Sequence, residues 1–297
     1  RIILVLVEQT VASSLKESKI VLSKLKNNFL INGNLSKGIN PFDRGLSFGD
    51  GVFRTFLVKS GYPVNWDMHY EKLKVDATIL KIKVPSKKDL LHDVKKLFNA
   101  DKTYIGKVII TRGISDQGYQ FDRNIKSTRI VLKINYKKIN KVLYLNGVRL
   151  KVCNTRTAHH SIYGGAKHLN RIDNVLAKAE LDRSVFDGIM LDRNGYINEC
   201  VSSNIFARYG KVIVSPKQNN AGVSGVCKQI IIKNIESIGF KFKDQNIKLE
   251  KLKKADEVII TNSVFGALHV NQIEEKKWHN GLFAALIRDF IIKPDIK

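Results

Sequence analysis

The sequence predicts a two-domain protein of the α+β or α/β class, and two observations support this. Segments in which apolar residues alternate, as in strands, are interspersed with segments of helical spacing along the chain. A short polar stretch, YKKINK at residues 136–141, separates two blocks of such segments. The chain has 297 residues, 43% of them hydrophobic, and can bury one large core or two modest ones. We expect a small α+β domain over residues 29–135, a linker at 136–141 and a larger β-rich domain over residues 142–297.

The first domain is expected to follow an N-terminal extension, residues 1–28, to which we assign no role. FLING predicts a short strand with a turn, and GVFRTFLVKSGYPVNW predicts a hairpin that turns at Ser60 and Gly61. Two helices are expected next, over DMHYEKLKVDATIL and over SKKDLLHDVKKLF, the second capped by Ser86. YIGKVIITRG and STRIVLKINY then predict two strands.

The second domain is expected to consist mostly of strands. These are GVRLKVCN, GIMLD, YINEC, NIFARY, KVIVSP and, after a helix over SGVCKQIIIKNIESIG, EVIITNS. Tight turns are predicted at RNG and YGK. A further helix is expected to open at Lys167 within GGAKHLNRIDNVLAKAEL, after two glycines that allow a close backbone approach. Its spacing places on one face Leu169, Ile172, Val175, Leu176 and Ala179.

Charge and cysteine content exclude several classes of protein. The net charge is +24, but the lysines are scattered and no RNP, zinc-finger or helix-turn-helix motif is present, so we expect anionic small molecules and no nucleic acid. The longest apolar run near a terminus, residues 2–7, is too short for a membrane span or a signal peptide. Cys153, Cys200 and Cys227 lack CxxC spacing, which argues against a disulfide framework or a metal site. A cytoplasmic location fits best.

Three features point to chemistry. Lys167 at a helix start would lose its proton readily, because the amino end of a helix disfavours an ammonium group, and a neutral amine can form a Schiff base. Glu199 lies among small and apolar residues, and is either exposed at a turn or held for a cation such as a protonated pyridine nitrogen. NNAGVSGVCK is either an ordinary loop or a phosphate-binding helix start. Together these are the groups that pyridoxal phosphate requires from a protein.

Seven segments resemble, in order and spacing, the fold type IV pyridoxal-phosphate enzymes. This family holds branched-chain aminotransferases, D-amino-acid aminotransferases and aminodeoxychorismate lyase. The resemblance runs from Phe29 to about residue 275 and is carried by FLING, DRGLSFGDGVFRT, HYEKL, GGAKHLNRIDNVLAKAEL, GYINECVSSNIF, AGVSG and ADEVIITNS. It implies a homodimer with pyridoxal 5'-phosphate in the cleft between the two domains.

Within this family the sequence is most similar to the lyase. KHLNR at residues 167–171 resembles the lyase motif, Thr55 stands where the lyase has a threonine for proton transfer, and Asn262 resembles the asparagine that meets a substrate carboxylate. The resemblance implies conversion of 4-amino-4-deoxychorismate to 4-aminobenzoate and pyruvate in folate biosynthesis. An aminotransferase of D- or branched-chain amino acids, and a non-catalytic anion-binding protein on the same fold, stay open as alternatives.

The resemblance also implies roles for single residues. Lys167 would hold the cofactor and then act as general base, with proton help from Thr55, while Glu199 would keep the pyridine nitrogen protonated. The phosphate would be bound by Lys72, by the backbone of Val226 and Cys227, and by Ser263. The substrate would be met by Asn262, Arg112 and Gln117. Lys72 departs from the family's arginine, so that a point charge replaces a bidentate fork, and Gln117 stands where the lyase usually has a second arginine.

Overall fold

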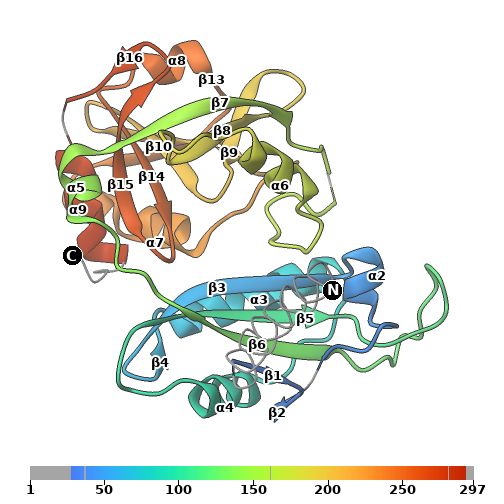
Figure 1. The fold of residues 1–297 in the computed structure, drawn as a ribbon. Coiled ribbons are helices and arrows are strands. Elements are labelled where there is room, and N and C mark those ends of the chain that lie inside the picture. Colours follow the sequence, from blue (N-terminus) through green and yellow to red (C-terminus); the bar gives the residue numbers. More distant parts are fainter. Residues whose placement is uncertain (1–27, 37, 161, 280, 292–297) are drawn as a thin grey trace, which may run out of the picture.

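The computed structural model describes residues 28–36, 38–160, 162–279 and 281–291, and its first half forms a six-stranded sheet (Figure 1). The strand order is β2-β1-β6-β5-β3-β4, and all neighbours are antiparallel. The strands are β1 (Phe29–Ile31), β2 (Asn34–Leu35), β3 (Gly51–Lys59), β4 (Tyr62–Pro63), β5 (Tyr104–Thr111) and β6 (Thr128–Asn135). The predicted hairpin is confirmed, because Ser60 and Gly61 between β3 and β4 both have positive φ, of 49° and 72°.

Two of the helices in this half, α3 (Trp66–Ile79) and α4 (Lys87–Leu97), pack on the sheet and confirm the predicted helices. Ser86 caps α4 as expected, since its side chain accepts a hydrogen bond of 3.1 Å from the Asp89 amide. A short helix, α2 (Arg44–Phe48), was not predicted.

The second half forms a ten-stranded mixed sheet, with the order β12-β11-β10-β14-β15-β7-β8-β9-β13 and β16 paired to β15. Its strands are β7 (Val148–Arg156), β8 (Asp187–Leu191), β9 (Tyr196–Cys200), β10 (Asn204–Tyr209), β11 (Val212–Ser215), β12 (Lys241–Asp244), β13 (Ile247–Lys248), β14 (Glu257–Asn262), β15 (Gly266–Ile273) and β16 (Lys276–Lys277). The six strands predicted for this half are confirmed as β7 to β11 and β14.

The helices of this half lie around that sheet (Figure 1). They are α5 (Lys141–Asn146), α6 (Ile172–Ala179), α7 (Val226–Asn234), α8 (Leu249–Lys253) and α9 (Leu282–Ile291), with a 3-10 turn at Glu236–Ile238. Helices α7 and α9 bury a common cluster against it, which includes Ile231 and Ile287. Among the described residues, no helix has the length and apolar character needed to cross a membrane.

The prediction that a helix opens at Lys167 is wrong, because α6 begins only at Ile172. The preceding segment instead pairs with the edge of β3: the Phe53 amide donates to the Lys167 carbonyl (3.0 Å), and the Leu169 amide donates to the Gly51 carbonyl (2.9 Å). Backbone groups at a sheet edge need partners, and this segment of the second half supplies them. The two sheets therefore meet at this seam.

The N-terminal extension lies outside the described residues except for Asn28. Cys153, Cys200 and Cys227 are free and buried.

Candidate active site

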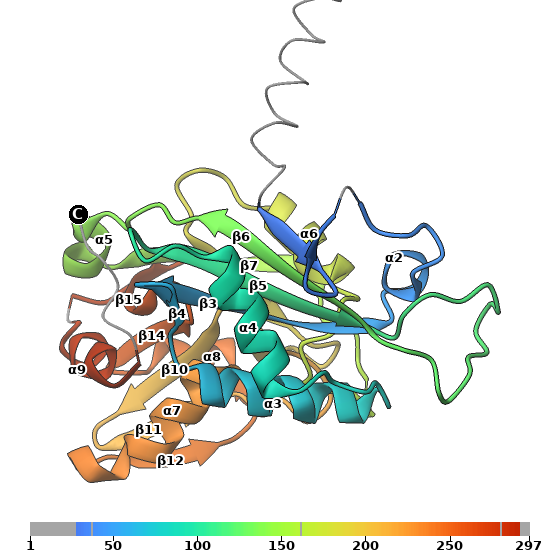
Figure 2. The same ribbon diagram turned by 90° about the horizontal axis from the view of Figure 1, so that it is seen from below.

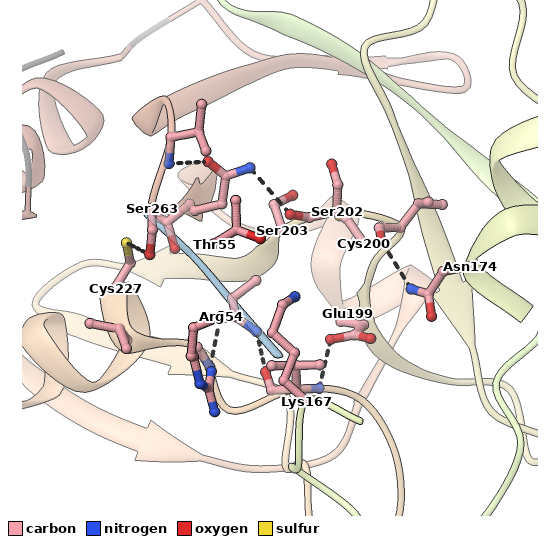
Figure 3. A pocket seen from close by; sticks show the side chains of 18 of the residues that line it. Arg54, Thr55, Lys167, Asn174, Glu199, Cys200, Ser202, Ser203, Cys227 and Ser263 are labelled. Carbon is pink, nitrogen blue, oxygen red and sulfur yellow. Dashed lines mark hydrogen bonds between the residues drawn. The ribbon is translucent and has the colours of Figure 1, made fainter. Parts of the chain in front are cut away.

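A cavity of about 330 Å³ lies at the seam between the two sheets (Figure 3). This volume is in the range of small-molecule sites. Its walls come from β3, β9 and β14, from the first turn of α7, and from the segment before α6. Seven of the residues expected at the site line it: Thr55, Lys167, Glu199, Val226, Cys227, Asn262 and Ser263.

Lys167 enters the cavity from the extended segment and not from a helix. Its backbone amide donates to the buried carboxylate of Asp76 (3.0 Å), and its Nζ lies 4.7 Å from the centroid of the Phe53 ring. Burial lowers the pKa of Lys167 to about 7, helped by the guanidinium groups of Arg171 and Arg54 and opposed by Glu199. The expected ease of deprotonation thus has a different cause from the helix dipole, because α6 starts beyond Lys167.

The two glycines before Lys167 do make the predicted close approach. A Cβ atom on Gly164 would lie 2.2 Å from the carbonyl oxygen of Asn219, and Gly165 has a φ of +78°. A side chain at either position would displace the segment that carries Lys167.

Glu199 in β9 is buried, which rules out the alternative of an exposed carboxylate at a turn. Its Oε2 accepts a hydrogen bond of 2.7 Å from the Val223 amide, and its Oε1 lies 4.0 Å from Nη1 of Arg171. Burial raises the pKa of Glu199, while Arg171 and the Val223 amide oppose this rise. Glu199 and Lys167 line the same cavity, with a carboxylate and an amine available to one ligand.

Helix α7 begins at the cavity with backbone groups that have no side-chain cap. Gly225 precedes it and offers none, so the first-turn amides, including those of Val226 and Cys227, lack intrahelical partners. Cys227 Sγ lies 3.6 Å from the hydroxyl of Ser263. Such a helix start favours an anion, as the sequence led us to expect for this segment.

Three expected residues do not line the cavity. The ammonium group of Lys72 on α3 binds Asp76 and the Gly165 carbonyl (3.2 Å). Arg112 is held by Asp50, with bonds of 2.7 and 2.9 Å, and it also donates to the carbonyls of Leu80 and Lys81. Gln117 is exposed in the loop between β5 and β6. The two cations are engaged because each is buried close to a carboxylate, and a buried charge requires such a partner.

Sequence reasoning missed other residues that line the cavity, above all Arg54, His69 and Thr261. Arg54 interrupts an apolar strand, and His69 shares the buried face of α3 with Trp66 and Leu73. A charged or polar residue at a core position of a predicted strand or helix was the available signal, since such a group needs a partner when buried.

Residues 51–273 match the model of the family described as Amino-transferase class IV. The chain belongs to this family. Aminodeoxychorismate lyase of Vibrio harveyi is 29% identical over 246 residues, 82% of this chain and 91% of the relative. That of Bacillus subtilis is 31% identical over 243 residues, 80% of this chain and 82% of the relative. The crystal structure of 4-amino-4-deoxychorismate lyase from Pseudomonas aeruginosa superposes with a TM-score of 0.84 at 30% identity, covering 88% of this chain and 97% of that chain.

Membership of the class IV family confirms the predicted fold. It also confirms pyridoxal 5'-phosphate as the predicted cofactor. The cavity fits this group. It offers an amine at Lys167, a carboxylate at Glu199 and the free amides of α7, and three of the residues that line it have a buried polar atom with no hydrogen-bond partner among the described residues. These atoms are Arg54 Nε, His69 Nδ1 and Thr261 Oγ1. Buried polar groups rarely stay unpaired, so a polar ligand is the natural complement of this wall.

Proposed function

We propose that the protein is a pyridoxal-phosphate-dependent lyase that converts 4-amino-4-deoxychorismate to 4-aminobenzoate and pyruvate in folate biosynthesis. The observation that carries the proposal is the convergence of Lys167, Glu199 and the start of α7 on one cavity. The two relatives and the solved structure named above, all aminodeoxychorismate lyases, support this choice of reaction.

When bound, pyridoxal 5'-phosphate supplies a ring that accepts the electrons released at the substrate carbon. Glu199, whose buried carboxylate accepts a hydrogen bond from the Val223 amide, would keep the pyridine nitrogen protonated when the cofactor is bound. Lys167 would hold the cofactor through Nζ and, once the 4-amino group of the substrate has taken its place, would remove the proton from C4 of the substrate. Its pKa of about 7 makes the neutral amine available near neutral pH.

Thr55 would assist departure of the enolpyruvyl group. Its side chain lines the cavity from β3, on the strand that also carries Phe53 beneath Lys167. A hydroxyl can hand a proton to the leaving oxygen as the carbon–oxygen bond breaks. The ring that remains is aromatic, which makes the elimination strongly downhill.

Asn262 would meet a substrate carboxylate with part of its amide. Its Oδ1 is engaged by the amides of Val264 and Phe265, at 2.9 Å each, and its Nδ2 donates to the Ser202 carbonyl at 3.2 Å. One amide hydrogen remains for a ligand. The substrate contacts expected from Arg112 and Gln117 lack comparable support, because neither side chain lines the cavity of this chain.

The proposal includes a homodimer in the cytoplasm. Helices α2 and α6 lie at the same end of the molecule (Figure 2), where Asn170, just before α6, donates a hydrogen bond of 3.1 Å to the carbonyl of Gly49, just after α2. This end carries large apolar side chains that are more than half exposed: Phe42 at 60%, Leu46 at 63%, Ile172 at 64%, Val175 at 61% and Leu176 at 53%. Such a patch is typical of a protein interface, and we assign it to a second copy of the chain.

The test uses the visible absorption of the purified protein with added pyridoxal 5'-phosphate, followed by aminodeoxychorismate and assays of both products. We expect the wild type to show an absorption band with the cofactor and to form pyruvate and 4-aminobenzoate in equal amounts. Lys167→Ala should abolish the band and lower turnover about 10⁴-fold or more. Lys107→Ala is the control, because this lysine also lies over the Phe53 ring, at 4.6 Å, yet does not line the cavity.

Other outcomes favour the alternatives. Repeated turnover with a 2-oxo acid as amino acceptor, without pyruvate from aminodeoxychorismate, would identify an aminotransferase. The absence of any band would leave a non-catalytic anion-binding protein.

A further inference from the structure

Arg54 is a buried cation on the wall of the cavity, in the middle of β3. Only 3% of its surface is exposed. Its Nη2 binds Asp76 and the Lys72 carbonyl (3.3 Å), whereas its Nε has no partner among the described residues. A guanidinium group carries five N–H donors in a fixed fork, and in Arg54 the Nε donor has no partner within the described residues.

Two further unpaired groups lie on the same wall. His69 and Thr261 line the cavity, and their buried atoms Nδ1 and Oγ1 have no partner in the described part of the chain. Burial, with Arg54 and Lys167 nearby, lowers the pKa of His69 to about 3, so the imidazole is neutral. A neutral imidazole and a hydroxyl can each donate one hydrogen bond to an oxygen-rich ligand.

The charges around Arg54 are not balanced by the protein. Arg54 and Lys72 share a single carboxylate, Asp76, which is fully buried. Burial lowers the pKa of Arg54 to about 9 and that of Lys72 to about 7, which reflects the cost of holding both charges here. An anion in the cavity would offset this cost.

The position of Arg54 relative to Lys167 and Glu199 matches the shape of the cofactor. Figure 3 shows Arg54 and Cys227 on one side of Lys167 and Glu199 on the other. In pyridoxal 5'-phosphate the carbon that bears the phosphate arm is next to the one that bears the aldehyde, while the ring nitrogen lies across the ring. With the aldehyde at Lys167 and the nitrogen at Glu199, the phosphate falls on the side of Arg54 and the start of α7.

We propose that Arg54, together with the amides of Val226 and Cys227, binds the cofactor phosphate, and that Lys72 does not. The Lys72 ammonium is engaged by Asp76 and Gly165 and holds Asp76 in place beneath Arg54. An arginine on β3 thus takes over the contact for which Lys72 on α3 was the expected residue. This inference rests on the cofactor of the proposed function and is independent of the reaction that the protein catalyses.

The test compares pyridoxal 5'-phosphate with pyridoxal, which has the same aldehyde and no phosphate. Both are titrated into cofactor-free protein, and binding is followed by absorption. Arg54→Gln should lower the affinity for pyridoxal 5'-phosphate about tenfold or more and leave that for pyridoxal nearly unchanged, because only the phosphate meets the lost guanidinium. Lys72→Met, the matched control, should leave the ratio of the two affinities close to that of the wild type.

Two additions separate a binding effect from a folding effect. Arg54→Lys keeps the charge and loses the fork, so its loss should be intermediate. Thermal unfolding of each variant without cofactor shows whether it is folded. Inorganic phosphate should compete with pyridoxal 5'-phosphate on the wild type and compete poorly on Arg54→Gln.

Each contrary result overturns the inference in a distinct way. A ratio that falls in Lys72→Met and not in Arg54→Gln would return the phosphate contact to Lys72. A ratio unchanged in both variants would leave α7 as the sole phosphate site. If the wild type binds neither aldehyde, the cofactor of the proposed function fails, and the inference fails with it.

Discussion

Lys167, His69 and His168 share one electrostatic condition, since each is removed from bulk water and has cationic neighbours. Burial is the largest cause of the lowered pKa in all three, to about 7 for Lys167 and to about 3 for each histidine. Arg54 adds to the effect at His69, and Arg171 adds to it at His168. All three side chains therefore lose their protons more readily than they would in water, which makes the neutral, reactive amine of Lys167 accessible near neutral pH.

The neutral histidines predict how stability depends on pH. In the unfolded chain each takes up a proton near its ordinary pKa of 6.5, whereas in the folded protein it does so only near 3. The unfolded state thus binds more protons between these values, so the free energy of unfolding falls as the pH drops from 6.5 toward 3. Denaturant unfolding between about pH 4 and pH 7 measures this slope, which His168→Asn should reduce. Native imidazole resonances of His168 that titrate near 6.5 would contradict the prediction.

At the scale of elements, one carboxylate joins three parts of the first half. Asp50 lies between α2 and β3 and accepts bonds from Arg44 of α2 (3.0 Å) and from Arg112 after β5. Arg112 also binds the carbonyls of Leu80 and Lys81 just beyond α3. Its donors are therefore directed to the protein and not to the cavity.

We predict that Arg112→Leu acts on stability before it acts on substrate binding. The change leaves Asp50 with less charge compensation and removes the donors that bind the Leu80 and Lys81 carbonyls, and it should lower the free energy of unfolding by about 3 kcal/mol. Chemical denaturation measures this loss, and Arg123→Leu, an exposed arginine in the following loop, serves as the control. A raised KM at unchanged stability would instead assign Arg112 to the substrate.

For the whole molecule, the exposed apolar end formed by α2 and α6 is the surface that we assign to a second copy of the chain. The spacing of α6 correctly groups Ile172, Val175 and Leu176, yet this face points to solvent and not to the core of the chain. The buried side of α6 is marked instead by Ala177, which packs with Cys153 and Met190. A helix with apolar residues on both sides is expected where a second surface covers it.

A dimer formed through this end is tested by charge. Val175→Asp combined with Leu176→Asp should convert the wild-type dimer to a monomer, because the two carboxylates would be buried without partners. Leu145→Asp is the matched control, since this residue is equally exposed, at 65%, on α5 at the far side of the molecule (Figure 1). Light scattering gives the mass in solution, and a wild type that stays monomeric at all concentrations would refute the dimer.

Much of the architecture was predictable because its signals are local. Alternation of apolar residues, helical spacing, the Ser86 cap and the Ser60–Gly61 turn each depend on a few neighbouring residues. Short elements such as α2 and β13 escaped prediction, because so few residues carry little pattern, and the longer β15 and α9 were not predicted either. Lys167 and Glu199, the candidate lysine and carboxylate, were found because their motifs can be recognised without knowledge of how the chain packs.

The sequence by itself determined most of the strands and longer helices around the site, the family resemblance and the presence of a lysine and a carboxylate suited to one cofactor. The tertiary structure decided which cations face the cavity: Arg54 does, whereas Lys72 and Arg112 are held by Asp76 and Asp50. It also decided that Lys167 is extended and that its pKa falls through burial. The physical reason is that charge pairing and desolvation depend on distances between segments far apart in the chain, which only the packing of α3, β3 and the seam between the sheets sets.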